Sequence, residues 1–208
     1  MIELGIYGGT FAPVHVGHVA AARAFAKEAA LDRLLVIPTL IPPHKQLTYN
    51  DNPLDRLNML KLAFEEDTRS DKGVIEVSDY ELNAPPPSYT VNTLRHFSSN
   101  NVHLTFLCGT DMFLTLDKWR EPETIFSLSR IALMVREENA DETLRSEIEQ
   151  KKRFYAQEYN ADIITINSPA IEISSSAVRS GNDELRQKYL PQKVYDYVKE
   201  KGLYATHN

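Results

Sequence analysis

Residues 2–30 of the chain read IELGIYGGTFAPVHVGHVAAARAFAKEAA. The run IELGIYG at 2–8 is apolar and typical of a strand, whereas the stretch from about 18 to 30 is rich in strong helix formers. Between them, GGTFAPVHVGH at 8–18 gathers three glycines, a proline and two histidines. This order predicts a strand and a helix that are joined by an unusual loop.

The rest of the chain repeats the alternation of strand and helix. Further apolar runs that indicate strands lie at 33–39, 74–82, 102–108, 130–136 and 161–166. Helices are expected from 53 onward and at 89–99, 122–128, 137–159, 174–181 and 191–202, with 137–159 as a charged, solvated one. This alternation predicts an α/β fold with a doubly wound, mostly parallel sheet and helices on both of its faces.

Several unusual loops follow the predicted strands. They lie at 8–18, 42–46, 83–90, 109–111 and 173–179. In open parallel sheets, ligands bind beyond the carboxyl ends of the strands, at the point where the strand order reverses. We therefore expect these loops to converge on one crevice.

The composition is that of a globular protein, with 208 residues, 42% hydrophobic and 25% charged, and it fits a single domain over 1–208. No apolar stretch is long enough for a membrane span, and the N-terminus shows no signal peptide. The one cysteine, Cys108, excludes an internal disulfide, and a net charge of −6 argues against a nucleic-acid surface. We expect a cytoplasmic protein that binds neither membrane nor nucleic acid.

The loop at 8–18 has features that suit a bound phosphate. Gly8 and Gly9 at the end of a strand can turn tightly and present bare N–H groups to an anion. His15 and His18 are three positions apart at the start of a helix, so their side chains can share a face. Helix N-termini favour anions, and two imidazoles there can hold phosphate oxygens.

Two other interpretations of the histidines remain open from these residues alone. The pair can belong to a zinc site, although no HExxH pattern is present and no third ligand is evident. Alternatively, one histidine can be a hydrogen-bonded part of the folded interior.

The complete string GGTFAPVHVGH closely resembles the N-terminal signature of the HxGH nucleotidylyltransferases. It is most similar to the bacterial nicotinate-nucleotide adenylyltransferases, whose usual form is GGTFDPxHxGH. Agreement extends, in order, to IPPHK at 41–45, APPPSYTVNTL at 84–94, GTDMFLTLDKW at 109–119 and ISSSAVR at 173–179. The resemblance implies a Rossmann-like fold and adenylyl transfer from ATP to nicotinate mononucleotide in NAD synthesis.

One position departs from the family pattern. Ala12 stands where the family usually has aspartate, and the missing carboxyl group can have braced the loop or contacted a ligand. With both histidines present, we interpret Ala12 as a tolerated or compensated change.

The resemblance assigns the phosphates of ATP to side chains and backbone from several loops. The implied catalytic residues are His15, His18, Lys45 and Arg179. The implied phosphate-binding residues are Gly8, Gly9, Thr10, Phe11, His44, Arg136, Ser175 and Ser176. Local sequence allows simpler roles: a solvated loop for His44 and Lys45, helix capping for the serines, and a surface ion pair for Arg136.

The resemblance also assigns a site for the acceptor nucleotide. The implied residues are Ser88, Tyr89, Thr90, Gly109, Thr110, Asp111 and Trp119. Helix N–H groups near Ser88 can receive the nicotinate carboxylate, and Trp119 can stack on the pyridine ring. The local alternatives are a core position for Trp119 and a helix cap for Asp111.

In the implied reaction, the phosphate of nicotinate mononucleotide attacks the α-phosphorus of ATP in line, without a covalent intermediate. Mg²⁺ is the expected ion, bridging the phosphates without a dedicated carboxylate site, and a homodimer is possible by family likeness. Three alternatives are kept: another phosphate acceptor such as nicotinamide mononucleotide or phosphopantetheine, a non-catalytic nucleotide sensor, and a metal-dependent hydrolase.

Overall fold

The computed structural model describes residues 1–41, 52–69, 73–135, 141–167, 171 and 173–204. Its strands are β1 (Ile2–Gly9), β2 (Arg33–Pro38), β3 (Val74–Val77), β4 (Val102–Gly109), β5 (Ser129–Val135) and β6 (Ile163–Asn167). Its helices are α1 (Val16–Glu28), α2 (Pro53–Ala63), α3 (Tyr80–Asn83), α4 (Thr90–Phe97), α5 (Thr110–Phe113), α6 (Pro122–Leu128), α7 (Glu142–Tyr159), α8 (Ser175–Ser180), α9 (Asp183–Tyr189) and α10 (Gln192–Glu200). Two 3₁₀ turns lie at Asp67–Arg69 and Leu116–Lys118.

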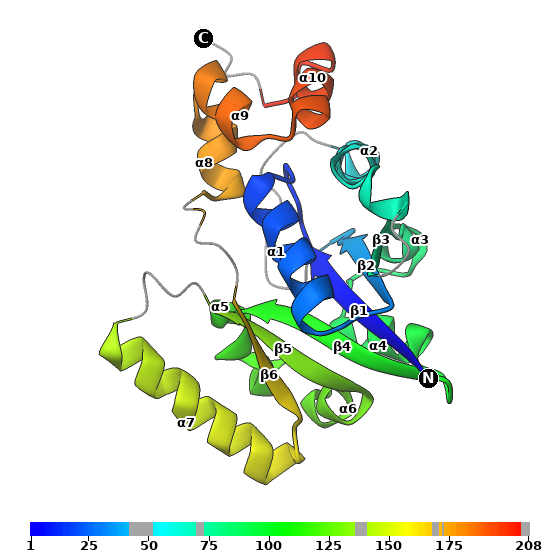
Figure 1. The fold of residues 1–208 in the computed structure, drawn as a ribbon, viewed down its shortest axis with the longest axis vertical. Coiled ribbons are helices and arrows are strands. Elements are labelled where there is room, and N and C mark those ends of the chain that lie inside the picture. Colours follow the sequence, from blue (N-terminus) through cyan, green and yellow to red (C-terminus); the bar gives the residue numbers. More distant parts are fainter. Residues whose placement is uncertain (42–51, 70–72, 136–140, 168–170, 172, 205–208) are drawn as a thin grey trace.

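The strands form one parallel sheet in the order β3-β2-β1-β4-β5-β6 (Figure 1). The chain passes from β1 outward to β2 and β3, then returns to the centre with β4 and continues to β5 and β6. The order therefore reverses between β1 and β4, as in doubly wound α/β folds. The predicted fold class is confirmed.

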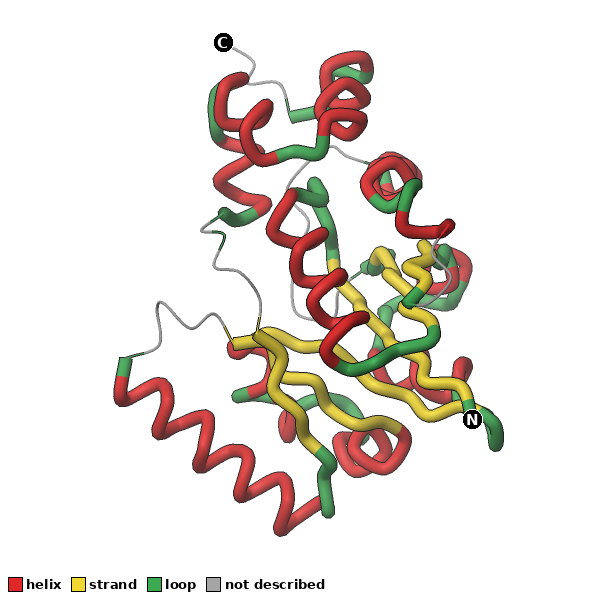
Figure 2. Tube along the Cα trace, in the orientation of Figure 1, coloured by secondary structure: helices red, strands yellow, loops and turns green. Residues whose placement is uncertain are grey.

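Helices cover both faces of the sheet (Figures 1 and 2). Because successive strand residues point to opposite faces, Leu34 and Val36 of β2 pack with α1 and α2, whereas Leu35 and Ile37 pack with the helices of the other face. The first core also receives α8 and α10, and the second receives α4, α6 and α7. This continuous burial on both faces explains why the strands are apolar runs without alternation.

The prediction of a single strand over 74–82 is wrong in its second half. β3 ends at Val77, and the chain turns at Ser78, whose Oγ accepts the N–H of Tyr80 at 3.3 Å as α3 begins. β3 pairs with β2 only from Arg33 to Val36, although β2 itself continues to Pro38, and after the bond from Ser78 N–H to the Val36 carbonyl the chain leaves the sheet. Short apolar runs do not separate strand from helix, and here tertiary pairing decides between them.

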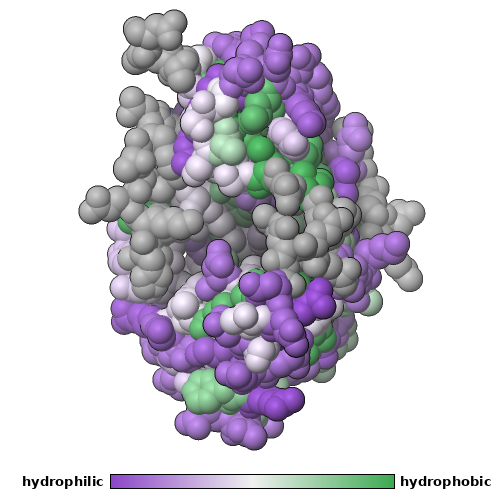
Figure 3. Space-filling model, turned by 90° about the vertical axis from the view of Figure 1, so that its left-hand side faces the viewer, coloured by the Kyte–Doolittle hydropathy of each residue, from purple (hydrophilic) through white to green (hydrophobic). Residues whose placement is uncertain are grey.

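Other differences concern boundaries and short elements. α1 begins at Val16 rather than near 18, and α5, α9 and the 3₁₀ turns were not predicted. The charged α7 is largely exposed, as expected, with Ile148 and Tyr155 as its buried side chains. Hydrophilic side chains dominate the lower part of the face in Figure 3, where α7 lies. Among the described residues, no helix has the length and apolarity needed to cross a bilayer.

Candidate active site

The predicted motif loops follow β1 and β4, the two strands on either side of the reversal in strand order. β1 runs through Gly8 and Gly9 into the loop that ends at α1, and β4 ends at Gly109, directly before α5. Both loops therefore leave the same edge of the parallel sheet, where open α/β sheets bind ligands. The expected convergence of these two loops is present.

The loop after β1 is tightly packed. Phe11 has a positive φ of 50°, and its side chain is only 3% exposed. A Cβ on Gly9 would lie 2.9 Å from the Phe11 ring, too close for any other residue without a shift. Similarly, a Cβ on Gly17 would lie 3.1 Å from the His15 ring. These two glycines make room for side chains of the motif itself.

His15 and His18 are in direct contact. Their rings stack with centroids 3.7 Å apart and an interplanar angle of 26°. His15 is 2% exposed and occupies the N-cap of α1, whereas His18 is half-buried. The backbone N–H of His15 donates to Nδ1 of His18 at 3.2 Å, which leaves the ring proton of a neutral His18 on Nε2. His18 can therefore present an Nε2–H donor at the helix N-terminus.

The loop is braced by α8, which comes from the other end of the chain. Nη1 of Arg179 donates to the carbonyl of Ala12 at 2.6 Å, and Oγ of Ser175 donates to the carbonyl of Pro13 at 3.0 Å. Nη2 of Arg179 also donates to Oγ of Ser176 at 3.0 Å. The structure thus brings together the predicted phosphate residues of both motifs, 167 positions apart at Ala12 and Arg179.

The three serines at 174–176 have different contacts in the structure. Ser174 is the N-cap of α8, because its side chain accepts the N–H of Ala177 at 3.1 Å. Ser175 holds the motif loop, and Ser176 contacts Arg179. Ala12 is buried at 1% exposure, and its backbone is held by Arg179, so a side chain is not needed to brace the loop here.

Arg56 is a structural residue of the site that the sequence interpretation missed. It is fully buried in α2, and its Nη1 donates to the carbonyls of Thr10 at 2.9 Å and Thr39 at 2.7 Å. Nη2 reaches the carbonyl of Leu40 at 3.5 Å. The sequence did hold a sign of this burial. Arg56 precedes Met59 by three positions and Leu60 by four, which places it on the apolar face of the helix.

Two of the three segments that carry the predicted acceptor residues touch each other, 88–90 and the one that contains Trp119. Ser88–Thr90 precedes and begins α4, and the guanidinium of Arg120 lies 4.8 Å from the ring centroid of Tyr89. Trp119, the residue before Arg120, is half-buried, with its ring 6.3 Å from that of Phe106. Trp119 is therefore not enclosed in the core.

The N–H groups at this helix start are only partly available. The N–H of Ser88 donates to the carbonyl of Ile41 at 3.1 Å, and that of Tyr89 to Pro87 at 3.0 Å. Thr90 is the first residue of α4, and the N–H groups of Asn92 and Thr93 in its first turn donate to the carbonyl of Tyr89, at 3.0 and 3.5 Å. A carboxylate would thus be received at the N–H groups of Thr90 and Val91 rather than at Ser88.

The segment after β4 presents polar groups to solvent. Gly109 is the N-cap of α5, and Gly109 and Asp111 are exposed while Thr110 is half-buried. Since Gly109 holds the N-cap position, the capping alternative for Asp111 is not supported. The remaining predicted residues, His44, Lys45 and Arg136, lie outside the described residues.

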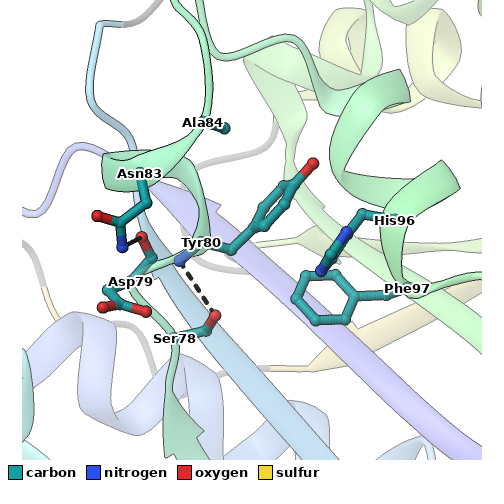
Figure 4. A pocket seen from close by; sticks show the side chains of 7 residues that line it. All are labelled: Ser78, Asp79, Tyr80, Asn83, Ala84, His96 and Phe97. Carbon is teal, nitrogen blue, oxygen red and sulfur yellow. Dashed lines mark hydrogen bonds between the residues drawn. The ribbon is translucent and has the colours of Figure 1, made fainter.

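The zinc alternative needs a third ligand beside the two histidines. Within the described part of the chain, no group of three histidine, cysteine, aspartate or glutamate side chains is placed to hold a metal ion. A cavity of about 440 Å³ lies elsewhere, over α3 and the end of α4. There the rings of Tyr80 and His96 stack with their centroids 4.0 Å apart, and Ser78 and Asn83 also line the cavity (Figure 4). None of the predicted substrate residues lines it.

Known proteins that resemble this chain belong to the family that the motifs indicated. Residues 6–181 match the family described as cytidylyltransferase-like. A probable nicotinate-nucleotide adenylyltransferase of Caldicellulosiruptor saccharolyticus is 33% identical over 206 residues, covering 98% of this chain and 99% of its own. One from Clostridium botulinum strain Eklund 17B is also 33% identical, covering 98% of each chain.

Solved structures share the fold. The Plasmodium falciparum nicotinic acid mononucleotide adenylyltransferase complexed with NaAD has a TM-score of 0.73 at 20% identity, covering 100% of this chain and 99% of its own. A putative nicotinate-nucleotide adenylyltransferase from Vibrio parahaemolyticus has a TM-score of 0.61 at 18% identity, covering 96% and 99%. The chain therefore belongs to the cytidylyltransferase-like family and, within it, to the nicotinate-nucleotide adenylyltransferases.

Proposed function

We propose that this protein transfers the adenylyl group of ATP to nicotinate mononucleotide through the residues at the β1–β4 reversal. An oxygen of the mononucleotide phosphate forms a bond to the α-phosphorus of ATP, and the bond from that phosphorus to the β-phosphate oxygen breaks. The products are deamido-NAD and pyrophosphate. The nucleophile is already an anion, so neither a protein base nor a covalent intermediate is needed.

The stacked histidines at the start of α1 carry this proposal. Nε2–H of His18 is a donor for an α-phosphate oxygen, and His15 lies against it at the helix N-terminus, where backbone N–H groups also favour anions. Catalysis then consists of positioning two anions and stabilising the charge that develops on the transferred phosphoryl group.

The remaining phosphate residues are assigned by likeness and by neighbourhood. Arg179 and Ser176 lie beside the motif loop and supply a guanidinium and a hydroxyl on that side of the site. We assign Gly8, Gly9, Thr10 and Phe11, at the end of β1 and in the loop after it, to the phosphates of ATP. His44, Lys45 and Arg136 are retained as proposed contacts to the β- and γ-phosphates and to ATP.

On the acceptor side, we assign the nicotinate carboxylate to the N–H groups of Thr90 and Val91 in the first turn of α4, beside Ser88 and Tyr89. Trp119 offers a half-buried ring next to this helix start, which supports stacking on the pyridine. We assign Gly109, Thr110 and Asp111, at the end of β4 and the start of α5, to the acceptor nucleotide, with the exposed Asp111 carboxylate as an acceptor for ribose hydroxyls.

Magnesium belongs to the substrate in this proposal. Mg²⁺ demands oxygen ligands and retains water readily, so the phosphates of ATP can hold it without a protein carboxylate cluster. The donor adenylyl substrate is therefore MgATP. A cytoplasmic location and a homodimer are kept as predictions, and light scattering in solution would measure the oligomeric state.

Product analysis tests the proposed function. The protein is incubated with ATP, Mg²⁺ and equal concentrations of nicotinate and nicotinamide mononucleotide, and the dinucleotides are separated by mass spectrometry. We expect deamido-NAD as the main product with equimolar pyrophosphate. Main formation of NAD, or pyrophosphate release only with phosphopantetheine, would reassign the acceptor, and ATP binding without any transfer would contradict the proposal.

A further inference from the structure

Glu81 in α3 is an unusual buried acid. It is only 7% exposed, and among the described residues no basic side chain forms an ion pair with it. Its Oε1 accepts a hydrogen bond from Oγ1 of Thr93 at 2.7 Å, whereas its buried Oε2 has no hydrogen-bond partner among the described residues. Burying a carboxyl group in this way costs free energy, so its retention needs a reason.

The groups around Glu81 are hydroxyls from separate segments. Burial raises the pKa of Glu81, and the hydroxyls of Thr93, Ser88 and Thr39 offset part of that rise. Thr93 belongs to α4, Ser88 lies just before it, and Thr39 follows β2. Because α3 contacts β2 and Glu81 accepts a hydrogen bond from Thr93 of α4, the carboxyl group lies between the start of α4 and β2.

Other hydrogen bonds hold both sides of this junction. Thr39 is fixed independently of Glu81, since its N–H donates to the carbonyl of Gly9 at 2.9 Å and its carbonyl accepts from Arg56 at 2.7 Å. The Ser88 side is held by Leu40 N–H to Ser88 Oγ at 3.3 Å and Ser88 N–H to the Ile41 carbonyl at 3.1 Å. Loss of Glu81 removes the bond to Thr93 of α4 but none of the bonds that hold the motif loop, and would thus release the start of α4 more than that loop.

We propose that Glu81 is a positioning residue for the acceptor nucleotide, holding the first turn of α4 against the end of β2. This inference rests on the proposed function, because the N–H groups of Thr90 and Val91 are the assigned carboxylate site. It adds a residue that does not touch the substrate itself. Removal of the Glu81 carboxyl group should weaken the binding of the acceptor nucleotide and leave the binding of ATP unchanged.

The test is a split between the two Michaelis constants. In Glu81→Ala, we expect the KM for nicotinate mononucleotide to rise about tenfold, the effect of one lost hydrogen bond of ordinary strength, while the KM for ATP stays within about twofold. Glu81→Gln should restore most of the acceptor KM, because its amide can accept from Thr93 and donate to the other hydroxyls. Equal changes in both constants, or none, would overturn the inference.

A second variant guards against a misfolded Glu81→Ala. Thr93→Val removes the hydroxyl that donates to Oε1 but keeps the shape of the side chain, and we expect it to raise the acceptor KM in the same direction. An unchanged acceptor KM in Thr93→Val would count against the inference. The matched control is Glu76→Gln on β3, where an exposed ion pair with Arg33 is lost and both constants should stay the same.

The two proposals fail in different ways. If the wild-type protein uses another phosphate acceptor, the function proposed above is wrong, but the ratio of variant to wild-type KM for that acceptor still tests Glu81. Calorimetric titration of each mononucleotide into wild type and Glu81→Ala gives the same ratio without turnover. Acceptor affinities that are equal in wild type and Glu81→Ala would overturn the Glu81 inference alone.

Discussion

At the residue scale, the two histidines show how much a spacing can predict. A separation of three positions at a helix start indicated that His15 and His18 share a face, and the rings do stack. Spacing said nothing of their different burial. His15 is enclosed at 2% exposure because Gly17 and the loop before α1 pack against it, whereas His18 remains half-buried.

This difference makes His18 the better residue for a test of catalysis. A donor to a developing phosphoryl charge in a site shielded from water contributes about 3 kcal/mol, so His18→Ala should lower kcat about a hundredfold or more. Steady-state kinetics of pyrophosphate release measures this, with far-UV circular dichroism to show that the fold is kept. The control is His103→Ala, whose imidazole pairs with Glu3 near the amino end of β4. Normal turnover in His18→Ala would remove it from the mechanism.

Arg56 and Glu81 illustrate what residue patterns do not reveal. Both are charged residues on otherwise ordinary helical stretches, where a solvated position is the usual expectation. Arg56 is buried because the carbonyls of Thr10, Thr39 and Leu40 converge on it from two strand ends. That convergence depends on β1 and β2 being neighbours, which no local pattern states.

At the scale of elements, α7 supports the segment that carries Trp119. Nζ of Lys151 lies 2.7 Å from the carboxylate of Asp117, and the hydroxyl of Tyr155 lies 2.9 Å from the same oxygen and 2.7 Å from the carbonyl of Phe113. Burial raises the pKa of Tyr155, and the Asp117 carboxylate adds to this, so the hydroxyl stays protonated and donates. α7 thereby fastens the chain between β4 and Trp119.

Removing that hydroxyl should loosen this connection. Tyr155→Phe keeps the ring but leaves the Phe113 carbonyl without its donor, so we expect a loss of about 1–2 kcal/mol in the free energy of unfolding. Urea unfolding followed by the fluorescence of Trp119, the single tryptophan, measures it. Tyr159→Phe on the same helix is the control, because Tyr159 packs through its ring on Phe126 and should change by less than about 0.5 kcal/mol. Equal stability of wild type and Tyr155→Phe would contradict this role of α7.

At the scale of the whole molecule, the parallel sheet buries its central strands on both faces. Cys108 in β4 is 1% exposed and lies between β1 and β5, and burial raises the pKa of its thiol to about 12. Almost no thiolate is present at neutral pH, and the thiolate is the form that reacts with disulfide reagents.

Labelling of Cys108 should therefore report unfolding of the entire sheet. We expect native protein to resist a disulfide reagent, with a labelling rate that rises with urea in parallel with the loss of circular dichroism. Denatured protein provides the fully reactive reference. Rapid labelling without denaturant would show that the sheet opens locally at β4, contrary to its central place.

The sequence by itself determined the class of fold, the order of most elements and the motif residues at the ends of β1 and β4 and in α8. These are local properties, because apolar runs, helix formers, glycines and histidines act through neighbours a few positions away. Only the tertiary structure decided that β3 stops at Val77 and that Arg179 and Ser175 hold the loop at Ala12 and Pro13. It also decided that Arg56 is buried against the carbonyls of Thr10 and Thr39, and Glu81 against Thr93. Those outcomes depend on which strands lie side by side and which carbonyls are left to satisfy, and such groups become neighbours only when the chain has folded.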